Sequence, residues 1–81
     1  MKLYVTMTDK FMSGWAHARG MINKYIVICD NWDDAVIIEK NARKRSEMKY
    51  ININITKPKN KPGYLLTFKK FSELGEIWTK E

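Results

Sequence analysis

The sequence predicts a single α+β domain over residues 1–81, with a four-stranded, antiparallel-rich sheet and two helices in the order ββαββα. Three observations predict this class. The length of 81 residues allows one small domain. A hydrophobic content of 44% is typical of a folded chain rather than a disordered one. Finally, several runs with the period of a strand surround one stretch with the period of a helix.

The first half of the predicted sheet comes from two segments near the N-terminus. Leu3, Val5 and Met7 occupy alternate positions, which predicts a half-buried strand. Residues 9–24 contain two glycines and no clear period, so we expect a long loop. Residues 25–29 form a continuous apolar run, YIVIC, which is typical of a central strand buried on both faces.

A helix is expected to follow, beginning near Trp32 and ending near Ser46, with Asp30 or Asn31 as its N-cap. Acidic residues in its first turn and basic residues in its last turn match the helix macrodipole. Its core-facing stripe is predicted from helical spacing to contain Trp32, Ala35, Ile38 and Ala42.

The second half of the chain predicts a hairpin and a short final helix. Every second residue from 51 to 55 is isoleucine, the clearest strand pattern in the chain. Residues 57–63 contain two prolines and a glycine and predict a turn, so residues 49–69 are expected to pair as a hairpin. The polar face of this strand would show Asn52 and Asn54 to solvent or a partner. The final helix would be capped by Ser72 and carry Phe71, Leu74, Ile77 and Trp78.

The net charge of +6 is concentrated in one part of the chain. Residues 25–39 carry a net charge of −4, whereas residues 40–61 carry +7. This balance excludes an acidic DNA mimic and favours an acidic partner. No apolar run approaches the ~20 residues that span a bilayer, and no export signal is seen, so we expect a cytoplasmic protein with no membrane partner. A single cysteine, Cys29, agrees with this.

The residues that support enzyme chemistry are few. One histidine and one cysteine exclude the usual His/Cys zinc sites, and no phosphate-binding glycine motif occurs, so we expect neither a metal nor a cofactor. A nucleophilic pair of Cys29 and His17 is one alternative. A buried, inert thiol at the end of an apolar strand is the favoured interpretation. We therefore expect no catalytic residue and no enzyme.

Two segments are candidates for binding a partner. The loop at residues 9–24 offers Lys10, Trp15, His17 and Arg19, since tryptophan and arginine are enriched at interface hot spots. An equally weighted interpretation is that its aromatic residues fold back to cap the core. The end of the predicted helix offers a second set, Lys40, Arg43, Lys44 and Arg45, which exceeds the charge that helix capping requires.

Three further lysines stand in the predicted turn. Together with the helix end they would form one phosphate-binding patch if both lay on the same side of the domain. This set consists of Arg43, Lys44, Arg45, Lys57, Lys59 and Lys61. Because the sequence lacks an RNA-recognition aromatic motif and zinc-finger spacing, any such binding would depend on charge and shape rather than on base reading.

Residues 8–15 (TDKFMSGW), with Gly20 and residues 23–24, 41–43 and 46–50, resemble the small proteins carried by phages and other mobile elements. These include the anti-CRISPR proteins and other inhibitors of host defence. The resemblance is one of type and covers most of the chain. It implies a non-enzymatic inhibitor that binds a host defence protein or nucleoprotein complex in the cytoplasm of a host cell. Many such inhibitors are acidic, and the positive charge departs from that pattern.

Two functions are therefore predicted, and the sequence leaves the oligomeric state open. The first is a phage-type inhibitor that acts through the loop and the helix end. The alternative is a small basic protein that binds DNA or RNA through phosphate contacts. A virion assembly factor is a third class with no residue in its favour.

Overall fold

The elements follow one another in the predicted order. The computed structural model describes residues 2–9, 22–46 and 48–80. Along the chain its elements are β1 (Leu3–Asp9), β2 (Ile22–Cys29), α1 (Trp32–Arg43), β3 (Met48–Asn54), β4 (Tyr64–Lys70), a 3₁₀ turn η1 (Phe71–Glu73) and α2 (Glu76–Thr79). This confirms the α+β class, with four strands in one sheet and two helices.

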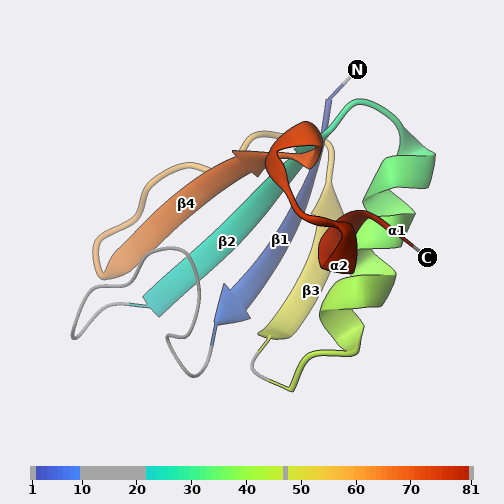
Figure 1. Cartoon of the computed structure of the whole chain (residues 1–81). Helices are drawn as coiled ribbons and strands as arrows, with labels where there is room; N and C mark the ends of the chain where they lie inside the picture. The colour runs from blue at the N-terminus through green and yellow to red at the C-terminus, as the bar shows by residue number, and fades with distance from the viewer. Residues whose placement is uncertain (1, 10–21, 47, 81) are drawn as a thin grey trace.

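The four strands pair in the order β3-β1-β2-β4 (Figure 1). β1 is antiparallel to both β2 and β3, whereas β4 is parallel to β2. The predicted hairpin of β3 and β4 is therefore wrong, because these strands form opposite edges of the sheet. β2 is apolar along most of its length. β4 pairs with the side of β2 that faces away from β1, so the backbone groups of β2 are hydrogen-bonded and β2 is not an edge strand.

One face of the sheet packs against α1 and carries the core. Residues that pair directly across antiparallel strands share a face, and Val5 pairs with Val27 and Met7 with Tyr25. All four are buried, together with the helix residues Ala35, Ile38 and Ala42. The predicted helical stripe is thus confirmed for Ala35, Ile38 and Ala42, and the predicted burial of β2 is confirmed for Tyr25, Ile26, Val27 and Cys29.

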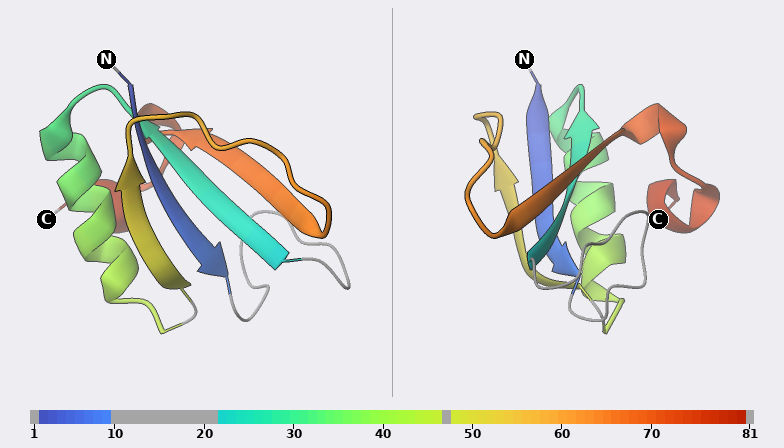
Figure 2. Two further views of the ribbon diagram at one scale, coloured as in Figure 1. Left: turned by 180° about the vertical axis from the view of Figure 1, so that it is seen from behind. Right: turned by 90° about the vertical axis from the view of Figure 1, so that its left-hand side faces the viewer.

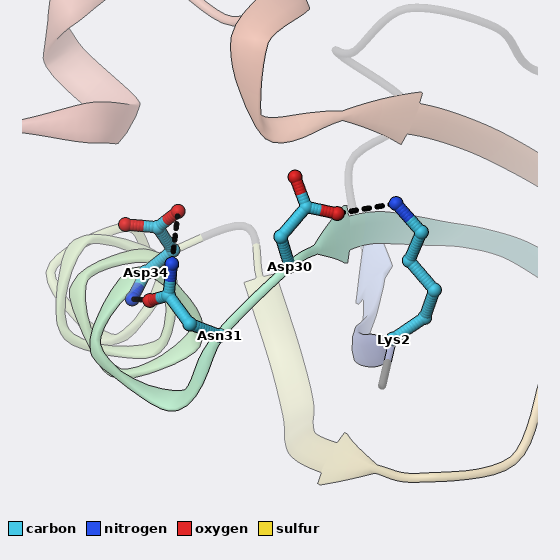
Figure 3. A network of polar contacts seen from close by, with 4 residues as sticks. All are labelled: Lys2, Asp30, Asn31 and Asp34. Carbon is cyan, nitrogen blue, oxygen red and sulfur yellow. Dashed lines mark hydrogen bonds and ion pairs between the residues drawn. The ribbon is translucent and has the colours of Figure 1, made fainter.

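The N-terminus of α1 is capped as the sequence predicts, with Asn31 in the capping position. The backbone N–H of Asp34 donates to Oδ1 of Asn31 at 2.8 Å, and Nδ2 of Asn31 donates to the Asp34 carboxylate at 3.3 Å (Figure 3). Beside this cap, Lys2 pairs with Asp30, which raises the pKa of Lys2 and lowers that of Asp30. The polar network joins the start of β1 to the end of β2.

Two details of α1 differ from expectation. Trp32 is 58% exposed and does not begin the core stripe. Helical side chains slant toward the N-terminus, so a residue in the first turn extends past the helix end rather than onto the strands. The helix also ends at Arg43, before the predicted Ser46.

The C-terminal segment is two short turns rather than one helix. The backbone at Leu74 and Gly75 is extended, and Gly75, not Ser72, is the N-cap of α2. Trp78 is buried as predicted, whereas Ile77 is 72% exposed. Asn41 holds this segment against α1, since its Nδ2 donates to the carbonyls of Trp78 at 2.7 Å and Lys80 at 2.8 Å.

Candidate nucleic-acid interface

The face of the sheet that points away from α1 is built from the alternate residues of each strand. The register places Thr6 beside Ile26, and Ile26 beside Phe68, so these residues share this face. Lys24 pairs with Leu66 in the same way. We call this surface the open face, because α1 and α2 both lie on the other side (Figure 2).

Residues 55–63 connect the two edge strands and pass across the open face (Figure 2). Between this connecting segment and the sheet lies a groove of about 570 Å³. From the sheet it is lined by Thr6, Lys24, Ile26, Tyr64 and Leu66, among others. From the connecting segment it is lined by Ile55, Thr56, Lys57, Pro58, Lys59 and Lys61. We call this feature the lysine groove.

The charge of the lysine groove has one sign. Within the described part of the chain, its lining includes four lysines and no acidic residue. The acidic residues Asp33, Asp34 and Glu39 lie on α1, across the sheet. The fold therefore places these acidic residues on the side of the sheet opposite the four groove lysines, which line a concave surface.

Lys24 lies at the centre of this arrangement and is half-buried on β2. Burial lowers the pKa of Lys24, and the nearby charge of Lys61 lowers it further. Its Nζ also lies 5.9 Å from the centroid of the Tyr50 ring, within the range of a cation–π contact. An anion bound in the groove would act against both effects, because an opposite charge stabilises the ammonium form of Lys24.

Tyr50 reaches Lys24 because β3 is irregular at this point. The register with β1 shifts between Thr6 and Thr8, so that Tyr50 and Ile51 oppose one residue of β1. Tyr50 has a φ of 55°, an uncommon left-handed conformation for a tyrosine. This β-bulge changes the direction of β3 at Tyr50. β-Bulges are frequent beside functional sites.

The predicted turn lysines are brought together by the fold. Lys57, Lys59 and Lys61 are exposed and all line the lysine groove. Nζ of Lys57 lies 5.2 Å from the centroid of the Phe68 ring, which holds the connecting segment over β4.

The basic helix end lies elsewhere. Arg43 is the last residue of α1, and Lys44 and Arg45 follow it. This helix end lies on the face of the sheet opposite the lysine groove, so the single patch considered from the sequence does not form. Arg43 pairs with Glu39 at 3.2 Å, and the guanidinium of Arg45 stacks 4.2 Å from the centroid of the Trp78 ring. Lys40 and Lys44 are exposed.

The other predicted partner-binding residues, Lys10, Trp15, His17 and Arg19, lie outside the described residues. The role predicted for the loop therefore stays a prediction.

The sequence interpretation missed Lys24, Tyr64 and Leu66 as members of a site. A signal was available for Lys24, because it is a single charged residue inside the apolar strand Ile22–Cys29. No local signal marks the other two, since only the pairing of β4 with β2 brings them beside Lys24.

The thiol of Cys29 is fully buried at the end of β2. Burial raises its pKa from 9.0 to about 12, and the charges of Asp34 and Asp30 add to the effect. The thiolate is the reactive form, so we expect a thiol-specific reagent at pH ~8 to label the native protein only as fast as it unfolds. The measurement is the labelling rate with and without denaturant. Rapid labelling of the native protein would restore the nucleophile alternative.

The raised pKa of Cys29 also makes the stability of the fold depend on pH. Above the unfolded-state pKa of 9.0 the unfolded chain loses this proton first, so the contribution of Cys29 to stability falls as the pH rises toward about 12.

Among the described residues, no group of three or more His, Cys, Asp or Glu side chains is placed to hold a metal ion. In the same part of the chain, no helix is both long and apolar enough to cross a membrane. No protein-family model, curated protein or solved structure matches the chain.

Proposed function

We propose that this protein binds nucleic acid through phosphate contacts made in the lysine groove. The observation that carries the proposal is the convergence of Lys24, Lys57, Lys59 and Lys61 on one concave surface whose described lining has no acidic residue. Lysine clusters of this kind supply most of the affinity of proteins for nucleic-acid backbones.

The electrostatic surroundings of Lys24 also favour an anionic ligand. The charge of Lys61 and partial burial both disfavour the ammonium form of Lys24 in the free protein. A hydrophobic residue at this position of β2 would avoid both effects. A bound phosphate chain would neutralise the repulsion between Lys24 and Lys61 and would release counterions.

The first function predicted from the sequence, a phage-type inhibitor of host defence, stays a prediction. The loop residues that distinguish it lie outside the described part of the chain, and two of its helix-end arginines contact Glu39 and Trp78 within the protein. Binding of guide RNA or target DNA within a defence complex would also use the lysine groove, so the two functions are compatible. Both agree with the expected cytoplasmic location.

The test measures by fluorescence anisotropy how the affinity for labelled oligonucleotides of ~12 nucleotides depends on salt concentration. DNA and RNA are each used as single strands and as annealed duplexes. Four phosphate contacts to a single strand predict a slope of about −3 in log affinity against log salt. Affinity should therefore fall steeply between ~50 and ~200 mM salt. Absence of binding to every form at ~50 mM salt would contradict the proposal.

A further inference from the structure

We infer that the preferred ligand is a single strand, one of whose unpaired bases enters the lysine groove. This inference rests on the proposed nucleic-acid binding and names the form of nucleic acid that the groove accepts. It is carried by the apolar side chains at the floor of the groove and by the two walls that bound this floor, which phosphate binding alone does not require.

The floor of the groove is chemically unlike its rim. The surface of the floor is supplied by Leu66 and Tyr64, which are partly exposed, and the fully buried Ile26 lies beneath it. Lys57, Lys59 and Lys61 are exposed on the connecting segment above. An apolar and aromatic floor beneath cationic groups suits a nucleotide, whose base is flat and largely apolar on its faces and whose phosphates are anionic.

The size and shape of the groove agree with a nucleotide. Its volume of about 570 Å³ lies within the range typical of small-molecule sites. The sheet bounds it on one side and the connecting segment, residues 55–63, on the other (Figure 2). A ligand must therefore extend a group inward between these two walls to reach the floor.

A duplex has no such group to offer. The bases of a duplex are paired and stacked inside it. Its phosphates can contact the lysines at the rim of the groove, but its bases do not reach the floor. Contact with Leu66 and Tyr64 would require a base to leave the stack, at a cost of a few kcal/mol. A single strand has bases that are already free to turn outward and stack on aromatic rings.

The experiment compares one labelled strand of ~12 nucleotides with its annealed duplex at the same salt concentration. We expect the single strand to bind at least about tenfold more tightly, and a fluorescent base analogue in it to change emission on binding. Tyr64→Ala should weaken single-strand binding about tenfold, whereas Tyr64→Phe, which keeps the ring, should bind the single strand like the wild type.

The outcomes separate this inference from the proposed function. Equal affinity for strand and duplex, with no change in the base analogue, would overturn the inference and leave phosphate binding in place. Failure to bind either form would overturn both. The comparison on the wild-type protein decides the question even where Tyr64→Ala proves too unstable to measure.

Discussion

Replacing Lys57, Lys59 and Lys61 with glutamine is expected to weaken nucleic-acid binding at least about tenfold at ~100 mM salt. These exposed lysines line the groove, and each would lose one phosphate contact. Loss of three contacts should also reduce the salt slope for a single strand by about two. The measurement is a series of anisotropy titrations at several salt concentrations, with circular dichroism to show that the fold is retained.

The matched control is the triple replacement of Lys40, Arg43 and Lys44 with glutamine. It removes the same charge from the opposite face of the sheet, where Arg43 forms only an exposed ion pair with Glu39. Binding should change by less than about threefold, since only the long-range field is altered. If the control loses affinity as strongly as the groove variant, the helix end predicted from the sequence is the binding site and the lysine groove is not.

Replacing Asn41 with alanine is expected to lower the free energy of unfolding by about 2–3 kcal/mol. Asn41 is buried and its amide donates to two backbone carbonyls in and beside α2, those of Trp78 and Lys80. The variant would leave the Trp78 carbonyl without this donor and would loosen the buried Trp78 ring. For a domain of this size the midpoint of thermal unfolding should fall by about 10–20 °C.

The measurement is urea unfolding followed by circular dichroism, and Asn52→Ala is the matched control. Asn52 is exposed on β3, where its amide donates to the Tyr50 carbonyl at 3.2 Å. Its replacement should cost less than about 0.5 kcal/mol, as is usual for an exposed site. An effect of Asn41→Ala no larger than that of Asn52→Ala would show that the C-terminal segment is held by Trp78 packing alone.

Local pattern was sufficient for much of the fold. Alternation in β1 and β3, the apolar run in β2 and the spacing of Ala35, Ile38 and Ala42 all correspond to observed elements. The Asn31 cap was also predictable, because capping depends on residues within one turn of each other. Such features depend on the period and chemistry of neighbouring residues, which are visible in the chain itself.

The pairing of β4 was not predictable in this way. A turn-like composition at residues 57–63 favoured a hairpin, but it is equally compatible with a segment that crosses the sheet. The choice depends on which pairing buries more of β2, and this is a property of the assembled sheet. The pairing of β4 matters for the proposed function, because the crossing segment forms one wall of the groove.

The hydrogen-bond partners of Asn41 were also not predictable from the local sequence. In the chain it stands among basic residues and belongs to no recognisable motif. Its two acceptors are 37 and 39 residues away along the chain, at the far end of the sequence.

By itself, the sequence determined the α+β class, the order of the elements, the helix cap and a surplus of positive charge in residues 40–61. Only the tertiary structure decided how that surplus is divided. The sheet places the helix end on one face and Lys57, Lys59 and Lys61 on the other, where they join Lys24. The physical reason is that periodicity is local, whereas the position of a crossing segment follows from strand pairings between residues far apart in the chain.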